Sequence, residues 1–194
     1  MFLEEMADVI IGLVLKRKEA LYKNETTFSY KLFNLRNYDE NIEFEEFLSN
    51  EKLDDFVLKQ GDLILRLSYP LKIIEVDEEL EGCIVNNQYC IIRVKNEFNS
   101  LYDIGFIRCF FESKNAKEQF EKNLIGTTVK SIPVVKLRML KLPLVNKDKQ
   151  EKLSNLIKNW NNQKKLYKKI IKEKDIYYNS IVEREIEKEM KENE

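Results

Sequence analysis

The chain reads QEKLSNLIKNWNNQKKLYKKII over residues 150–171, within a run from residue 144 to residue 194 that contains neither glycine nor proline. These two residue types are the strongest interrupters of a helix. The apolar residues of the run return close to a heptad spacing, which is typical of an amphipathic helix with one apolar seam. We therefore predict one long helix over residues 147–194, of which roughly 45 residues would extend about 65 Å at 1.5 Å per residue.

A helix of this length extends beyond the surface that one small domain can offer, so we expect its seam to bind a partner helix. Large aromatic side chains in the seam favour such an interface. The alternative is that the helix folds back on its own domain and frays at its acidic end. The residues expected in the dimer or partner interface are Leu153, Ile157, Trp160, Tyr167, Ile170, Ile171, Tyr177, Tyr178 and Ile181.

The preceding residues, 1–146, predict one mixed α+β domain. Apolar runs of period two, or short continuous ones, indicate strands, and longer apolar periodicity indicates helices. The expected strands cover residues 10–15, 27–35, 63–67, 72–76, 89–94 and 139–144, and the expected helices cover residues 2–9, 101–111 and 116–124. Residues 39–59 are rich in acidic side chains, and we expect them to form a surface excursion.

The composition excludes most familiar catalytic sites. The chain has no histidine, which removes Ser-His-Asp and Cys-His catalysis and every histidine-containing metal site. Its five glycines form no nucleotide-binding loop, and its three prolines are never adjacent, as a Pro-Pro-aromatic tetrapeptide would require. Cys83, Cys90 and Cys109 form no Cys-x-x-Cys pair, so we expect these three residues to be small hydrophobic side chains buried in the core. No catalytic residue, metal or cofactor is predicted.

The net charge of -1 hides a strong segregation of charge along the chain. Residues 39–81 contain 14 acidic and 4 basic side chains, whereas residues 114–174 contain 5 acidic and 17 basic ones. Screening by salt limits the range of each exposed charge's field to about 8–10 Å. A basic region of a nearly neutral protein can therefore attract phosphate groups. The alternative is a lysine-biased composition and a merely solvated helix face. With a mean hydropathy of -0.47 and no long apolar run, we expect a soluble, cytoplasmic protein.

Six segments are informative by their order and spacing: Met6–Gly12 with Lys16–Lys18, Gln60–Ser68, Val85–Gln88 with Ile92 and Arg93, Gly126–Ile132, Leu140–Leu144 and Gln150–Leu153. Together they resemble the DNA-specificity subunits of type I restriction-modification systems. Gln60–Ser68 is similar to that family's Gly-Asp-(Ile/Leu)-Leu strand, and Gly126–Ile132 to its Gly-Ser/Thr-Thr segment.

The resemblance implies a target recognition domain over residues 1–146 and a spacer or dimerisation helix over residues 147–194. Family members usually contain two such domains and two long helices, whereas this chain has one of each, so it resembles half a subunit. The resemblance implies a non-catalytic protein that binds double-stranded DNA and directs a DNA methyltransferase subunit to its target. A homodimer through the long helix would restore two recognition domains. A restriction-translocase subunit is left open as a further partner.

Lysine and arginine neutralise phosphates, while asparagine, glutamine, arginine and serine can distinguish base edges in the major groove. We expect direct readout by Asn86, Asn87 and Gln88, then by Arg66, Ser68 and Tyr69; an ordinary polar turn is the alternative. Gly126, Thr127 and Thr128 are expected to bind a phosphate, or else to form a helix C-cap and turn. Phosphate or partner contacts are expected at Lys16, Arg17, Lys18, Lys72, Lys130, Ser131, Lys164, Lys165, Lys168 and Lys169.

Two other functions remain open at this point. The first is a coiled-coil scaffold protein whose basic helix binds an acidic protein. The second is a small Mg²⁺-dependent nuclease, because Glu112-Ser113-Lys114 and Glu189-Met190-Lys191 fit an acid-x-Lys element. Such matches are expected by chance in a chain so rich in glutamate and lysine.

Overall fold

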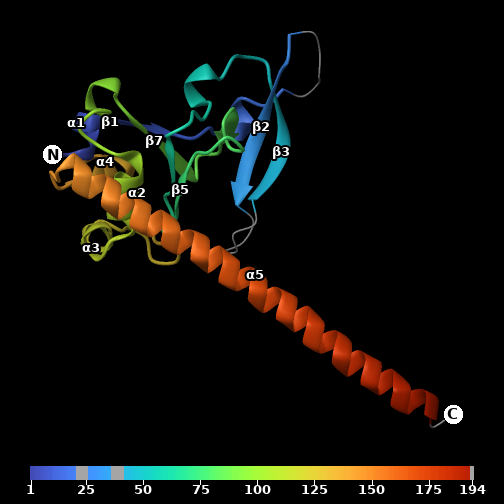
Figure 1. Ribbon diagram of the computed structural model, residues 1–194. Coiled ribbons are helices and arrows are strands. Elements are labelled where there is room, and N and C mark those ends of the chain that lie inside the picture. Colours follow the sequence, from blue (N-terminus) through green and yellow to red (C-terminus); the bar gives the residue numbers. More distant parts are fainter. Residues whose placement is uncertain (21–25, 36–41, 193–194) are drawn as a thin grey trace. The chain divides into compact units, whose positions relative to one another are not determined.

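The computed structural model describes residues 1–20, 26–35 and 42–192, and the chain divides into two compact units (Figure 1). The first unit spans Met1–Ser154 and contains the strands and the shorter helices. The second unit spans Asn155–Glu194 and belongs to the last helix. This is the predicted α+β architecture followed by a long helix.

A four-stranded antiparallel sheet with strand order β1-β7-β4-β5 organises the first unit. The register of β1 on β7 runs from Ala7 opposite Val94 to Ile11 opposite Cys90. β4 lies on the other side of β7, with Leu63 opposite Ile92. The strands of this sheet are β1 (Ala7–Ile11), β4 (Leu63–Arg66), β5 (Ile73–Glu75) and β7 (Tyr89–Val94).

A second sheet has three strands in the order β3-β2-β6. β2 (Phe28–Leu35) pairs antiparallel with β3 (Ile42–Ser49) and parallel with β6 (Cys83–Val85). β6 continues through the turn at residues 86–88 into β7 of the first sheet, so one short turn connects the two sheets.

The four-stranded sheet is buried on both faces, because successive side chains of a strand point to opposite faces. In β7, Cys90 and Ile92 pack in the core beneath the helices, whereas Tyr89 and Ile91 pack in the core shared with the second sheet. The same alternation places Ile64 of β4 in the second core. This double burial explains why these strands read as continuous apolar runs rather than as alternating ones.

Four short helices belong to the first core, and two of them begin at side-chain caps. The Asp103 carboxylate accepts a hydrogen bond from Phe106 N at 2.8 Å, and Ser113 Oγ accepts one from Ala116 N at 3.3 Å. The helices are α1 (Leu3–Met6), α2 (Ile104–Glu112), α3 (Lys114–Glu121) and α4 (Val134–Arg138). The short 3-10 turns are η1 (Leu15–Arg17), η2 (Asp54–Phe56) and η3 (Asn96–Phe98).

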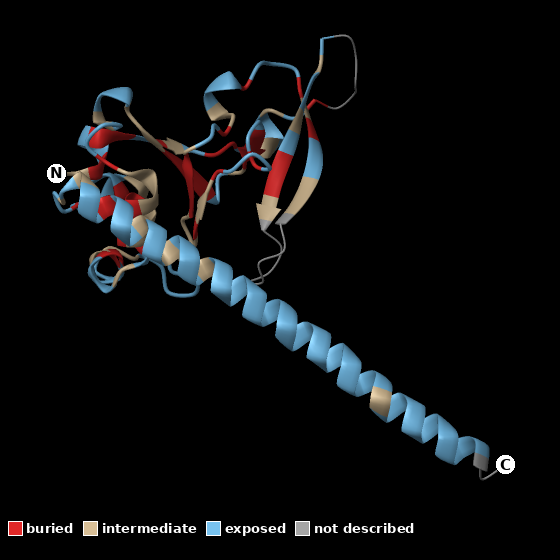
Figure 2. Cartoon of the chain, in the orientation of Figure 1, coloured by how far each residue is buried: buried red, intermediate tan, exposed pale blue. Residues whose placement is uncertain are grey.

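The last helix, α5, runs from Lys147 to Glu192 without interruption over 46 residues, as predicted. Beyond its first turns it is exposed along nearly its whole length (Figure 2). Helices that could cross a membrane were not found in the described residues.

The N-terminal prediction was wrong in its boundaries. The predicted helix over residues 2–9 ends at Met6, and the predicted strand over residues 10–15 is instead β1, Ala7–Ile11. The pairing of Ala7 with Val94 draws this segment into the sheet, which overrides its local helical pattern. Gly12 then passes so close to the turn that a Cβ there would collide with the Asn86 carbonyl.

The prediction of a surface excursion at residues 39–59 was also wrong, although residues 39–41 lie outside the described residues. Ile42–Ser49 is strand β3, hydrogen-bonded to β2. Its acidic side chains are compatible with an edge strand, where charge protects against further pairing. Phe47 and Leu53 are buried in a third core, so the apolar residues of this acidic stretch contribute to the core rather than lying on the surface.

The expected strand at residues 139–144 is not a strand. Only Lys141 forms an isolated bridge, to Phe2, while the neighbouring Leu140 and Leu142 are buried in the first core. Two short elements were not predicted, α4 and β6. Both are too short to leave a clear period in the sequence.

Candidate nucleic-acid interface

Three loops of the first unit meet through backbone hydrogen bonds. Leu67 N donates to Gln88 O at 2.9 Å, and Leu67 O accepts from Ile132 N at 2.9 Å. Tyr69 N donates to Lys130 O at 2.8 Å. These contacts hold together what we call the loop edge, residues 67–71, 86–88 and 125–131. The predicted residues that it brings together are Ser68, Tyr69, Asn86, Asn87, Gln88, Gly126, Thr127, Thr128, Lys130 and Ser131.

The turn at residues 86–88 is closed by its first side chain. Asn86 Oδ1 accepts a hydrogen bond from Gln88 N at 2.9 Å, and Asn87 N donates to Leu13 O at 2.9 Å. The side chains of Asn87 and Gln88 are exposed, whereas Asn86 is half-buried. Asn86 therefore shapes the turn, and Asn87 and Gln88 are the side chains that it presents.

The basic segment after β1 lies beside this turn, because Leu13 bridges Asn86 immediately before η1. Lys16 and Arg17 are exposed. Lys18 differs, since its Nζ lies 2.6 Å from a carboxylate oxygen of Glu51. Lys16 and Arg17 are thus better suited than Lys18 to neutralise a phosphate.

Arg66 and Lys72 lie where β4 leads into the loop edge and where the chain returns toward β5. Arg66 Nε donates to Ser68 Oγ at 2.9 Å, and Arg66 N donates to Lys72 O at 2.9 Å. Both side chains are half-buried. The Arg66 side chain and the Lys72 carbonyl stabilise this connection, and both side chains add positive charge near the loop edge.

Residues 125–131 form a small hairpin rather than a helix cap. Ile125 and Ser131 exchange two backbone hydrogen bonds of 2.9 and 2.8 Å. Gly126 has φ +103°, and a Cβ there would collide with the Val129 carbonyl, so this position requires glycine. Thr127 and Thr128 are exposed at the tip.

Two residues of the hairpin were missed by the sequence reasoning. Ile125 is 59% exposed and Val129 is 63% exposed, and Tyr69 on the adjoining loop is 53% exposed. Apolar side chains held out in a polar loop can contact a thymine methyl group or the apolar face of a base. Their type alone could not reveal this, because isoleucine and valine are the usual residues of a core.

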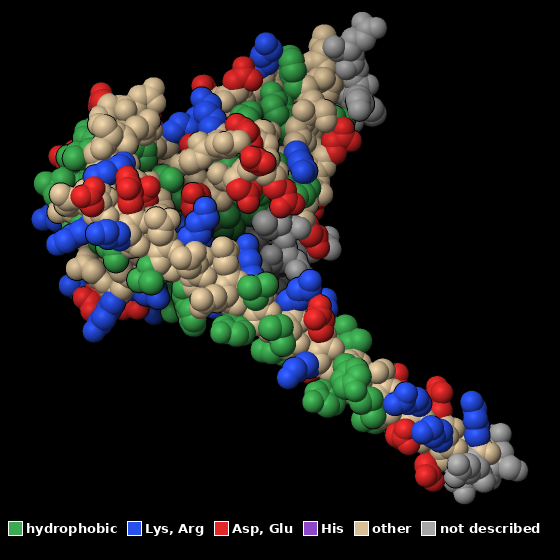
Figure 3. All heavy atoms as spheres, in the orientation of Figure 1, with side chains coloured by type: hydrophobic (Ala, Val, Ile, Leu, Met, Phe, Trp, Pro, Cys, Tyr) green, Lys and Arg blue, Asp and Glu red, His purple; other side chains and the backbone are tan. Residues whose placement is uncertain are grey.

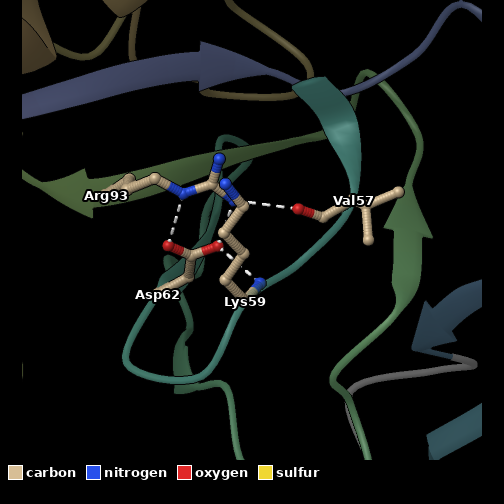
Figure 4. Close-up of polar contacts among 4 residues, drawn as sticks. All are labelled: Val57, Lys59, Asp62 and Arg93. Atoms are coloured by element: carbon tan, nitrogen blue, oxygen red, sulfur yellow. Dashed lines mark hydrogen bonds and ion pairs between the residues drawn. The ribbon is translucent and has the colours of Figure 1, made fainter. Parts of the chain in front are cut away.

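An ion pair supports β7 near its carboxyl end, away from the turn at residues 86–88 (Figure 4). Asp62 accepts from Arg93 Nε at 2.9 Å and from Arg93 Nη2 at 2.6 Å, and its second oxygen also accepts from Lys59 N at 2.8 Å. Arg93 Nη2 donates in addition to Val57 O at 2.8 Å. The hydrogen bond to Asp62 raises the pKa of Arg93 above its ordinary value. Arg93 therefore acts within the fold rather than as a phosphate contact.

The three cysteines are free thiols whose pKa values are raised. Cys83 and Cys90 are buried, as predicted, while Cys109 is half-buried. Desolvation by burial raises the pKa of Cys90 to about 12 and that of Cys109 to about 11. The thiolate is therefore scarce in the folded protein at neutral pH.

A shallow depression elsewhere on the first unit is lined by Glu4, Asp8, Asp55, Arg93 and Arg138 among others. Both guanidinium groups are already engaged, Arg93 with Asp62 and Arg138 with Val9 O at 3.1 Å. Over the described ranges, no three cysteine, aspartate or glutamate side chains gather as a metal site would require.

The predicted interface residues of α5 are mostly exposed, with Trp160 at 50% and Tyr167 at 58%. Ile157 and Ile181 are half-buried. Further exposed apolar side chains of α5 are Leu156, Leu166, Ile176, Val182, Ile186 and Met190.

Three solved structures have a similar fold. The S subunit of a type I restriction-modification system from M. genitalium matches with a TM-score of 0.53 and 14% identity, over 84% of this chain and 38% of that chain. The HsdS subunit from Thermoanaerobacter tengcongensis matches with a TM-score of 0.59 and 16% identity, over 88% of this chain and 43% of that chain. A chain from a study of the assembly and conformational transition of the type I R-M system matches with a TM-score of 0.59 and 15% identity. That match covers 87% of this chain and 43% of that chain.

The chain thus spans about two fifths of the length of the structures that it matches. No protein-family model and no curated relative matches the sequence. At 14–16% identity, the likeness establishes a common fold, one α+β unit followed by a long helix.

Proposed function

We propose that this chain is a non-catalytic DNA sequence-recognition protein, equivalent to one half of a type I specificity subunit. The observation that carries the proposal is the loop edge. Backbone hydrogen bonds join three loops far apart in the sequence, and these loops contain most of the residues predicted to bind DNA. The fold on which they lie is that of S subunits.

The loop edge is suited to read a duplex in two ways. Asn87 and Gln88 carry carboxamides, which can pair with the donor and acceptor of an adenine edge in the major groove. Lys16, Arg17 and Lys130 are exposed cations suited to the phosphates on either side of such a contact. Residues that position the protein and residues that read sequence therefore lie in the same part of the first unit.

The apolar face of α5 is proposed to join two copies of the chain. Exposed aromatic and aliphatic side chains recur along it, and no described residue of the second unit is buried. An antiparallel pair would bring the second half of each helix beside the first half of its partner, and Figure 3 shows acidic and basic side chains interspersed toward the C-terminal end. Such a dimer has twofold symmetry, so its DNA target would be an interrupted palindrome.

Catalysis is proposed to lie in a separate adenine methyltransferase subunit that this chain directs to its target. A restriction-translocase subunit is a further partner under the same proposal. The chain itself offers neither histidine nor a glycine-rich nucleotide loop for such chemistry.

The proposal is tested by binding to a library of random duplexes, followed by selection and sequencing of the bound fraction. We expect one enriched, interrupted palindrome, and sequence-dependent adenine methylation when the methyltransferase subunit is added. Retention of helix-mediated assembly without any duplex binding would instead support the scaffold function. An enriched but asymmetric motif would contradict the symmetric dimer and leave DNA recognition standing.

A further inference from the structure

The first half of α5 is rich in lysine. From residue 152 to residue 172 there are seven lysines and no acidic residue. Five of them recur at positions that face the same way on a helix, and we call these the lysine stripe. They are Lys158, Lys165, Lys168, Lys169 and Lys172, all exposed.

The stripe is separate from the apolar face of the helix. At about 100° per residue, its five members fall within an arc of about 100°. Trp160, Tyr167 and Ile171 centre on a direction roughly 135° away by the same geometry. Pairing of two helices through the apolar face would therefore leave the stripe accessible.

The composition of the stripe distinguishes between a nucleic acid and a protein as its partner. The positions interspersed on that side are polar, Ser154, Asn161 and Asn162, so the stripe lacks an apolar centre. Protein interfaces are built around apolar centres and are depleted in lysine. Phosphate backbones are instead bound by clustered lysine and arginine without any apolar anchor.

The spacing of the stripe also suits a duplex. From Lys158 to Lys172 the helix rises about 21 Å, which along a duplex axis corresponds to about six nucleotides of one strand at a rise of 3.4 Å each. Lys169 lies 3.9 Å from Glu173, but both side chains are mostly exposed, so this pair neutralises little of the charge.

We propose that the lysine stripe of α5 binds the phosphate backbone of duplex DNA, as a second contact that reads no sequence. The inference rests on the proposed function, because it adds to the contact made by the loop edge. It means that the long helix is a DNA-binding element in its own right as well as an interface between chains.

The test compares the full chain with the variant Lys165→Gln/Lys168→Gln/Lys172→Gln on a random-sequence duplex at several salt concentrations. Removal of three phosphate contacts should lower the slope of log affinity against log salt by about 2.7. The enriched motif from selection should stay the same. The matched control is Lys152→Gln/Lys188→Gln/Lys191→Gln, which makes the same charge change away from the stripe and should leave the slope close to wild type.

Circular dichroism and sedimentation of both variants verify that the helix and its assembly are intact. An unchanged slope in the stripe variant, with sequence-specific binding retained, would overturn this inference alone. A loss of binding to polyglutamate with no change on duplex would also overturn it, and would assign the stripe to an acidic polypeptide. Stripe-dependent binding without any enriched motif would support the stripe and contradict the proposed recognition function.

Discussion

Gln150, at the beginning of α5, is hydrogen-bonded to the residue that caps α2, because its Oε1 accepts from Asp103 N at 2.9 Å. Its Nε2 donates to Leu101 O at 2.8 Å and to Val145 O at 2.7 Å. The side chain is fully buried, so all three partners depend on this one carboxamide. The first turns of the long helix are in this way part of the first unit.

Substitution of Gln150 by alanine should destabilise the first unit by about 2–4 kcal/mol, since it leaves buried backbone groups without partners. Urea denaturation followed by circular dichroism measures the change. Gln163→Ala, at an exposed position of the same helix, is the control and should change stability by less than about 0.5 kcal/mol. Equal stabilities of the two variants would refute the structural role of Gln150.

Asp62→Asn should cost about 3–5 kcal/mol, because it leaves the Arg93 guanidinium without its counter-charge in a site where the two side chains are 3% and 20% exposed. Glu51→Gln removes the partner of Lys18 at a more exposed ion pair and should cost less than about 1 kcal/mol. Denaturant midpoints of both variants provide the comparison. A similar cost for both would mean that Arg93 finds another partner.

Replacement of Asn87 or Gln88 by alanine should weaken binding to the preferred sequence by about 1–3 kcal/mol and change binding to random DNA little. Lys130→Ala should weaken binding to every sequence and lower the salt dependence. Electrophoretic shifts on both duplexes separate the two effects. Proportional losses on specific and random DNA would remove the turn at residues 86–88 from the readout.

The raised pKa values of Cys90 and Cys109 should make stability fall at alkaline pH. A folded pKa raised above the ordinary value of 9.0 contributes stability that is present below pH 9 and is lost as pH rises toward about 11 for Cys109 and about 12 for Cys90. Urea midpoints at pH 8 and pH 10 measure the loss, and Cys90→Val should reduce it. A urea midpoint independent of pH in both proteins would contradict the raised pKa values of these thiols.

Truncation after Ser154 should give a folded, monomeric first unit, because it retains Gln150 and removes most of the exposed apolar face. Truncation after residue 146 should give a markedly less stable protein, since Gln150 is lost. Analytical ultracentrifugation at tens of micromolar should find the full chain dimeric and the 1–154 fragment monomeric. A full chain that sediments as a monomer would exclude the homodimer and leave a heteromeric helix partner.

The sequence by itself determined the elements whose signal is local. Absence of glycine and proline together with apolar recurrence predicts α5, since a helix is stabilised by bonds and contacts between residues three or four positions apart. Continuous apolar runs likewise predict β7 with the bounds that it has, and β4 with its end one residue too late. The polar residues 86–88 and the glycine at position 126 also predict the loops in which they lie.

Only the tertiary structure decided which of these loops lie together and what each side chain does there. The pairing of β3 with β2, the ion pair of Lys18 with Glu51, and the use of the Asn86 side chain inside its own turn depend on where other chain segments lie. The same holds for Val129, which is exposed because a hairpin leaves it no core to enter. Contacts between residues far apart in the chain follow from the packing of the whole unit, and so no local pattern records them.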